Sequence, residues 1–379
     1  MDFTFSEEQQ AALEAAKALF AGAAPDKVPS PALAPGAVAD DFDRTLWARL
    51  ADADLLSLLL DPEYGGAGLD PIAFCLVLRE SAKALARIPL LENTAAATAL
   101  QAHGSTEAKE ELLARTGRGE LVLTVAAHGR TGHDPAELAV AARKEPDGTW
   151  LLDGIQTAVP WAHTADIILV PAHTHDSGRT VLALVPRDHD GLVLTEQVST
   201  TGERLAELRL DSARIAAPHL LEADGAWEEL RLLLTTGTCA LALGLGEKVL
   251  EMTAEYTGRR EQFGHPIATF QAVAVQAADR YIDLRAMEAT LWQAAWRISS
   301  GSPGALPAAG DVAAAKIWAS EGVRRVVQTA QHLHGGFGAD TDYCLHRYHA
   351  WAKHLELSLG PAAAHEDALG NLLAAHPLG

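Results

Sequence analysis

The stretch RREQFGHPIATFQAV, Arg259 to Val273, separates two long helical segments and decides how the C-terminal part of this chain folds. Phe263, Gly264 and Pro266 interrupt the helical pattern, because glycine allows left-handed backbone and proline cannot continue a helix. We therefore predict a tight turn between two helices. From the residues alone, Arg260 is explained by capping carbonyl groups at a helix C-terminus, where cations are favoured.

The segments on both sides of this turn predict a bundle of about four helices over residues 223–379. The first helical segment carries Gly237, Gly244 and Gly246 among leucines. Each glycine costs up to about 1 kcal/mol inside a helix, so three of them predict close approach of neighbouring helices. The helical segments are apolar on more than one face, which predicts contacts with further chains and hence an oligomer.

The rest of the chain divides into a helical part and a strand-rich part. In the helical part, residues 1–118, Ser6 and Gln9 have the spacing of a capping box. A glycine-rich break, DPEYGGAGLD, follows at residues 61–70. Residues 119–222 alternate short β-rich runs with turns, which predicts a compact antiparallel barrel or sandwich. The predicted fold class is therefore α+β, with an N-terminal helical domain (1–118), a central β-barrel (119–222) and a C-terminal helical bundle (223–379).

Composition excludes several functional classes. Fifty acidic and 30 basic residues give a formal net charge of -20, which disfavours binding to nucleic acid or to an anionic membrane. A phosphate-bearing ligand therefore needs locally placed cations. Cys75, Cys239 and Cys344 lack metal or redox spacing, so we expect free thiols in a reducing compartment. We expect neither a leader sequence nor a membrane span, which favours the cytoplasm.

A second motif, HLHGGFGADTDYCLHRY, covers His332 to Tyr348. Gly335 and Gly336 follow a predicted helix end, where a C-cap and close backbone approach require glycine. Metal binding by His332, His334 and His346 is one reading of this motif, although it lacks a carboxylate set at metal spacing. The same loop equally suits a phosphate group or the edge of a flavin.

Four segments together resemble the acyl-CoA dehydrogenase family over nearly the whole chain. They are, in chain order, PEYGGAGLD (62–70), RREQFGHPIATFQ (259–271), AAAKIWASE (313–321) and HLHGGFGAD (332–340). The resemblance implies the family fold of an α-helical domain, a β-barrel and a four-helix bundle, which agrees with the fold class predicted above.

The resemblance also implies a FAD cofactor. In the family, the matching groups reach across a dimer interface to a FAD that is seated mainly in the neighbouring subunit. The residues of this chain that would make these contacts are Arg260, Gln262, Phe263, Gln271, His332, Gly335 and Gly336. Arg260 would place a cation beside the pyrophosphate, and the two glycines would bring main-chain N–H groups near the ligand.

The chain departs from the family at the catalytic base. Family members use a glutamate to take the α-proton, and the two family positions for it correspond here to Leu359 and Leu234. The resemblance therefore implies no catalytic residue from this chain. Glu356 and Glu229 lie near these positions and are the alternatives for a relocated base.

The family's flavin wall is also altered. AAHGRTGHDP (126–135) stands where the family has a glycine-rich loop, and Ala158 to Pro160 stand where it has a tryptophan and a threonine, with Trp161 three residues late. The chain thus resembles the non-catalytic subunit of heteromeric (α2β2) actinobacterial acyl-CoA dehydrogenases. A homologous partner chain would supply the glutamate for α,β-dehydrogenation of a bulky, sterol-type acyl-CoA.

Electrons would pass to an electron-transfer flavoprotein or a similar acceptor. Three alternatives stay open at this point: a self-sufficient homomeric dehydrogenase, a flavin-free binding protein on the same fold, and a flavoenzyme with different chemistry.

Overall fold

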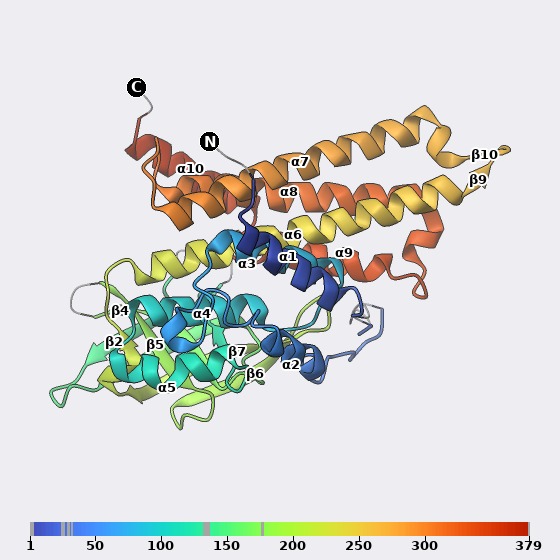
Figure 1. Cartoon of the computed structure of the whole chain (residues 1–379). Helices are drawn as coiled ribbons and strands as arrows, with labels where there is room; N and C mark the ends of the chain where they lie inside the picture. Colours follow the sequence, from blue (N-terminus) through green and yellow to red (C-terminus); the bar gives the residue numbers. More distant parts are fainter. Residues whose placement is uncertain are drawn as a thin grey trace.

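The computed structural model describes residues 4–23, 27–28, 31, 33–131, 137–175 and 178–377. It has the predicted three-part fold, in which N-terminal helices and a central sheet lie beside a long helical bundle (Figure 1). The exact domain limits at residues 118 and 222 stay a prediction. The first strand begins at Leu123, and the first bundle helix begins at Ala226.

The N-terminal part holds five α-helices and one 3-10 turn in its described residues. Ser6 caps the first helix: its Oγ accepts from the Gln9 N–H at 3.2 Å, and the Gln9 side chain accepts from the Ser6 N–H at 2.9 Å. The predicted capping box is therefore confirmed. The elements are α1 Glu7–Phe20, α2 Arg44–Asp52, η1 Pro62–Tyr64, α3 Pro71–Lys83, α4 Leu90–His103 and α5 Thr106–Gly117.

Helix α4 is one of the elements that the sequence pattern did not predict. It is buried on nearly every side, including the polar side chains of Asn93 and Thr94, so it lacks the polar stripe that marks an amphipathic helix. The Asn93 side chain accepts a hydrogen bond from the Leu123 N–H at 2.9 Å, which joins α4 to the first strand.

The central part forms one eight-stranded sheet in the order β6-β7-β3-β2-β4-β5-β8, with β1 beside β4. The predicted antiparallel arrangement holds for most strand pairs but was wrong for β4, which pairs in parallel with both β1 and β2. The strands are β1 Leu123–Val125, β2 Val140–Lys144, β3 Trp150–Pro160, β4 Ile167–Thr174, β5 Thr180–Pro186, β6 Leu192–Val198, β7 Arg204–Ile215 and β8 Leu220–Leu221, and the 3-10 turn η2 (Ala217–His219) precedes β8.

The C-terminal part is a bundle whose long helices run side by side (Figure 1). The turn predicted between its first two helices is a small hairpin of β9 and β10 in which Phe263 and Gly264 adopt left-handed φ values of 54° and 82°. The elements are α6 Ala226–Arg259, β9 Glu261–Gln262, β10 His265–Pro266, η3 Ile267–Thr269, α7 Gln271–Ser300, α8 Ala308–His334, η4 Gly335–Ala339, α9 Leu345–Leu357 and α10 Ala362–Ala375.

The glycines of α6 permit close packing, as predicted. A Cβ at Gly244 would collide with the Arg79 carbonyl of α3, and one at Gly246 would lie 2.8 Å from a methyl group of Leu284 on α7. Helix α6 is long and apolar enough to cross a membrane, but 78% of its apolar stretch is buried inside the fold. Its apolar character is that of a core helix.

The three cysteines are free, as the sequence predicted. Cys75 and Cys239 are buried in the core formed by α3 and α6, and Cys344 is half-buried. Burial raises the pKa of the Cys75 and Cys239 thiols, which makes them unreactive side chains of the core.

Candidate functional site

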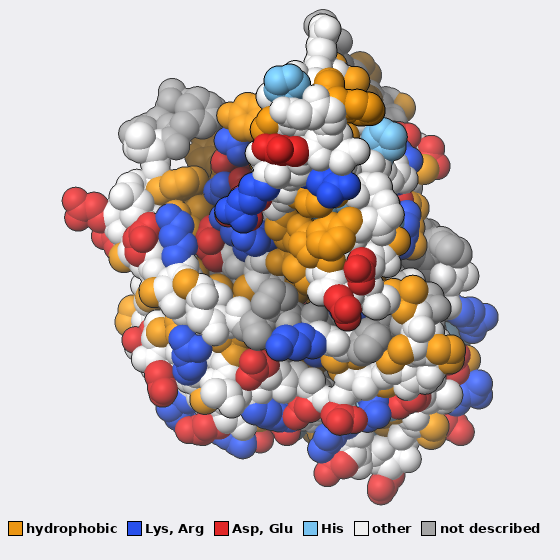
Figure 2. Space-filling view, turned by 90° about the vertical axis from the view of Figure 1, so that its right-hand side faces the viewer, with side chains coloured by type: hydrophobic (Ala, Val, Ile, Leu, Met, Phe, Trp, Pro, Cys, Tyr) orange, Lys and Arg blue, Asp and Glu red, His pale blue; other side chains and the backbone are white. Residues whose placement is uncertain are grey.

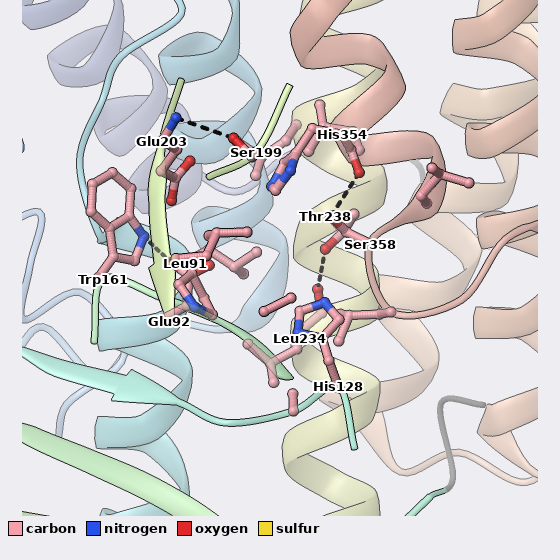
Figure 3. A pocket seen from close by; sticks show the side chains of 18 of the residues that line it. Leu91, Glu92, His128, Trp161, Ser199, Glu203, Leu234, Thr238, His354 and Ser358 are labelled. Atoms are coloured by element: carbon pink, nitrogen blue, oxygen red, sulfur yellow. Dashed lines mark hydrogen bonds between the residues drawn. The ribbon is translucent and has the colours of Figure 1, made fainter. Parts of the chain in front are cut away.

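A cavity of about 780 Å³ lies where α4, the sheet, α6 and the C-terminal end of α9 meet. Leu234 of α6 and Leu359, just after α9, both line it. At these two positions the family resemblance leads us to expect a glutamate. The structure brings both positions to one cavity, although they are 125 residues apart in the sequence. Figure 3 shows Leu234 and Thr238 together on the α6 side, and Thr238 Oγ1 donates to the Leu234 carbonyl at 2.9 Å.

The backbone at Leu359 is firmly held. Leu359 has a left-handed φ of 57°, and Gly360 follows it at 95°. The Leu359 carbonyl accepts a hydrogen bond from His365 Nε2 at 2.9 Å. The buried Lys316 ammonium donates to the carbonyls of Leu355 and Glu356, each at 3.1 Å, and so caps the end of α9. The backbone on both sides of Leu359 is thus fixed by hydrogen bonds, and the position presents an apolar side chain.

Neither of the two alternative bases is part of this cavity. The Glu229 carboxylate lies at the start of α6 and bonds to His103 Nε2 at 2.7 Å. The Glu356 carboxylate pairs with the Lys353 ammonium at 2.5 Å. Neither residue lines the cavity, so proton abstraction there by Glu229 or Glu356 has no geometric support.

A carboxylate that the sequence analysis missed does line the cavity. Glu92 of α4 accepts a hydrogen bond from Trp161 Nε1 at 3.1 Å, as Figure 3 shows. Burial raises the pKa of Glu92 to about 7, although the hydrogen bonds to its carboxylate oppose the shift. The signal that could have found it is the single acidic residue in the apolar run LLENTAAATAL, residues 90–100.

Two histidines are also part of the polar lining. His128 follows β1 and His354 lies on α9, and both line the cavity. Burial lowers the pKa of each to about 4, so both rings are neutral near pH 7. His128 Nδ1 is buried and has no hydrogen-bond partner among the described residues.

The wall of the cavity offers little to a flavin or a pyrophosphate. The Gln197 side chain accepts a hydrogen bond from the Ala158 N–H at 2.8 Å and donates one to Thr157 Oγ1 at 3.1 Å. These three polar groups of the wall are therefore already paired with each other. Lys353 is the single Lys or Arg among the described lining residues, and it is paired with Glu356. Of the altered loop at 126–135, residues 132–135 lie outside the described part of the chain.

The seven residues predicted to contact FAD lie elsewhere. All are exposed, and they belong to the β9–β10 hairpin, the start of α7 and the region where α8 passes into η4: Arg260, Gln262, Phe263, Gln271, His332, Gly335 and Gly336. Phe263 is 92% exposed. Figure 2 looks onto this end of the bundle and shows hydrophobic and basic side chains next to each other.

Tyr256 connects α6 to the loop after α8. Its ring stacks on His334 with centroids 4.3 Å apart and on Phe337 at 5.5 Å. Gly335 has φ 60° and ψ -140°, a conformation that favours glycine, and a Cβ at Gly335 or Gly336 would meet no other atom. The two glycines therefore leave the backbone open to an approaching ligand.

The metal-binding reading of the histidine motif finds no support in the described residues, where no three His, Cys, Asp or Glu side chains converge. His334 Nδ1 bonds to the Ala330 carbonyl at 2.8 Å, and His346 Nδ1 bonds to the Tyr343 carbonyl at 2.8 Å. His332 is exposed near the end of α8.

The neutral histidines predict a loss of stability in acid. Burial lowers the pKa of His128, His354 and His365 to about 4 from an ordinary 6.5. Between pH 6.5 and 4 the unfolded chain binds protons that the folded chain does not, so the free energy of unfolding should fall there. Each histidine contributes at most about 3.4 kcal/mol. Glu92, whose pKa is raised to about 7, acts in the opposite sense over this range and offsets about one such contribution. Denaturant unfolding at pH 7, 5.5 and 4.5 measures the net change.

His365→Gln should reduce this pH slope, because glutamine keeps a donor for the Leu359 carbonyl but does not titrate. Lys316 and Arg231 are the cations near His365, and Lys316 stays charged through this range because its pKa is lowered only to about 8. His265→Gln on the exposed hairpin is the matched control. An unchanged slope in His365→Gln would contradict the assignment.

Comparison with known proteins finds one family. A family model described as acyl-CoA dehydrogenase, N-terminal domain, matches residues 6–120, and one described as acyl-CoA dehydrogenase, C-terminal domain, matches residues 235–372. Acyl-CoA dehydrogenase FadE27 of Mycobacterium tuberculosis is 38% identical over 341 residues, which are 89% of this chain and 90% of that protein.

Two solved structures are similar over nearly their whole length. A chain of the ChsE4-ChsE5 complex from Mycobacterium tuberculosis has a TM-score of 0.89 and 36% identity, with 100% of both chains covered. A chain from a variant of the Tcur3481-Tcur3483 steroid ACAD has a TM-score of 0.87 and 35% identity, with 97% of this chain and 98% of that chain covered.

Proposed function

This chain belongs to the acyl-CoA dehydrogenase family, and we propose that it is the subunit of a heteromeric member that completes the FAD site of a homologous partner chain. One observation carries the proposal. The cavity of this chain has leucine at both family positions for the base, whereas the residues that would reach a neighbour's FAD are exposed at the far end of the bundle.

The exposed groups fit a FAD held jointly with a partner. Arg260 has no ion-pair partner among the described residues, so its guanidinium is available to a pyrophosphate. Gly335 and Gly336 leave room for a ligand against the backbone. Gln262, Phe263, Gln271 and His332 would complete the contact from this chain. When bound, FAD supplies the hydride acceptor for α,β-dehydrogenation, and the base comes from the partner's glutamate.

The exposed apolar side chains support an assembly of several chains. They lie on the hairpin, along α7 and α8, and in η4: Phe263, Phe270, Val275, Tyr281, Ile282, Trp318 and Phe337. Such side chains are typical of surfaces that a partner covers. The ChsE4-ChsE5 structure is itself described as a complex, which supports a heteromer here, and α2β2 is the stoichiometry that we propose for it.

The substrate we propose is a bulky, sterol-type acyl-CoA. The Tcur3481-Tcur3483 protein is described as a steroid ACAD, and this chain is 35% identical to one of its chains. We place the reaction in the cytoplasm, with an electron-transfer flavoprotein or a similar protein as the electron acceptor.

Co-expression tests the proposal. The chain expressed alone should bind FAD substoichiometrically and show no acyl-CoA dehydrogenation. Co-expression with a glutamate-bearing homologue encoded beside it should give a yellow complex with one FAD for each pair of chains. Flavin absorbance per protein and turnover of a steroid acyl-CoA measure the result. Full flavin loading and turnover by the lone chain would refute the heteromer.

A self-sufficient dehydrogenase is the second candidate, favoured by a single observation. Glu92 is a carboxylate in the cavity, and its pKa of about 7 suits a general base. If the lone chain were active, Glu92→Gln should abolish its turnover, whereas Glu229→Gln, outside the cavity, should leave turnover unchanged.

A further inference from the structure

We propose that the cavity between α4, the sheet, α6 and the end of α9 binds an uncharged, largely apolar small molecule that carries a hydroxyl or carbonyl group. The site is independent of the proposed function, which places the chemistry in the partner's FAD site. The ligand would bind in this chain as a second, non-reacting molecule.

The size and backbone of the cavity are those of a binding site. About 780 Å³ is within the range of about 300–1,000 Å³ that is usual for small-molecule pockets. Three lining residues other than glycine have left-handed φ values: Ala158 at 49°, Trp161 at 57° and Leu359 at 57°. Such conformations cost about 1–3 kcal/mol each and cluster where proteins bind ligands.

The wall of the cavity is mostly apolar. Leucine side chains from several separate elements face it, including Leu91 of α4, Leu205 of β7 and Leu234 of α6. Leu234 and Leu359 line the cavity with apolar side chains at the two positions where the family places the carboxylate base. A ligand with a large apolar surface therefore gains the most free energy from binding in the cavity.

Besides serine and threonine hydroxyl groups and the Gln197 amide, the polar lining has ionisable groups on opposite sides of the cavity. Figure 3 shows Glu92 with Trp161 on one side and His128 with Leu234 on the other. Trp161 Nε1 fixes one carboxyl oxygen of Glu92 at 3.1 Å. His128 Nδ1 is buried without a partner among the described residues, so a ligand hydroxyl or carbonyl would satisfy an atom that is otherwise unpaired.

The charges of the cavity disfavour an anion. Glu92 and Glu203 both line it, and the ammonium of Lys353 is already paired with Glu356 at 2.5 Å. His128 and His354 are neutral near pH 7 because burial holds their pKa values near 4. A carboxylate or a pyrophosphate would therefore lose its hydration without gaining a free cation in the described lining.

The experiment uses the co-expressed complex and Nile red, an uncharged apolar dye with a carbonyl group. Titration should show a saturable site on this chain in addition to any site on the partner. Leu234→Trp fills the cavity and should remove one dye site for each copy of this chain. Ala127→Leu fills less of the cavity volume. It keeps the test valid if Leu234→Trp has a lower melting temperature than the wild type. An unchanged number of dye sites in both variants would overturn the proposal.

Two matched competitors test the ligand class. 1-Decanol should displace the dye from this site at least about tenfold more effectively than decanoate, its charged counterpart. Glu92→Leu should weaken decanol binding about tenfold, since one hydrogen bond to a buried carboxyl group is lost. Glu229→Leu, outside the cavity, is the control. Equal displacement by decanoate, or equal effects of the two glutamate variants, would also overturn the proposal.

Discussion

Replacing Arg260 with alanine is expected to lower the FAD content of the co-expressed complex at least about tenfold. A charge-assisted hydrogen bond contributes about 1.5–3 kcal/mol, and 1.4 kcal/mol corresponds to a factor of ten in binding. The chain carries a net charge of -20, so its overall field repels the pyrophosphate and a lost local cation is not replaced. The ratio of flavin to protein absorbance after gel filtration measures the effect.

Arg259→Ala is the matched control for this experiment. Arg259 is the preceding residue, its side chain is 82% exposed, and the substitution changes the net charge by the same amount. It should leave the FAD content within about twofold of the wild type. Arg260→Lys should lie between the two, because lysine keeps the charge but cannot donate two parallel bonds. Equal losses in Arg259→Ala and Arg260→Ala would show a general charge effect and contradict the specific contact.

Replacing Lys316 with alanine is expected to lower the free energy of unfolding by about 3–5 kcal/mol. The Lys316 side chain is fully buried, and its ammonium donates to Ser320 Oγ at 2.8 Å and to two carbonyls at the end of α9. Alanine would leave a void and remove three hydrogen bonds, after which the Leu355 carbonyl lacks this donor and the Glu356 carbonyl keeps only its bond from Ser320 Oγ at 3.1 Å. Denaturant unfolding at pH 7 measures the change, since burial lowers the pKa of Lys316 only to about 8 and the group is still largely protonated there.

Two control variants separate the void from the lost hydrogen bonds. Lys316→Met fills most of the volume and should recover part of the stability, with about 1–3 kcal/mol still missing. Lys248→Ala removes a half-exposed lysine paired with Glu251 and should change the free energy of unfolding by less than about 1 kcal/mol. Wild-type stability in Lys316→Met would mean that the capping bonds contribute nothing.

Local chemistry explains how much of the fold could be predicted from the sequence. The Ser6–Gln9 capping box and the Phe263-Gly264 turn depend on neighbouring residues, and both were predicted correctly. Helix α4 could not be predicted, because a helix buried on all sides has no polar stripe. The parallel pairing of β4 with β1 and β2 joins segments distant in the chain, which no local pattern reveals.

The candidate site, like the fold, could be predicted from the sequence only in part. The resemblance led to Leu234 and Leu359, and the structure places both in one cavity. The sequence could not show that Glu229 and Glu356 lie outside the cavity. Glu229 pairs with His103 on another helix, and although Glu356 pairs with its near neighbour Lys353, the way α9 faces the cavity depends on tertiary packing. Glu92 and His128 were missed for a similar reason: their chemistry comes from burial among residues far away in the sequence.

Helix α6 carries both sites, with Leu234 near its beginning and Arg260 at its C-cap. At 1.5 Å for each residue, these positions are about 39 Å apart along a continuous helix. No single dinucleotide spans that length, so a flavin touched by the hairpin of one copy cannot also fill that copy's own cavity. Substitutions at the two ends should therefore act independently, and their effects on binding should add in a double variant.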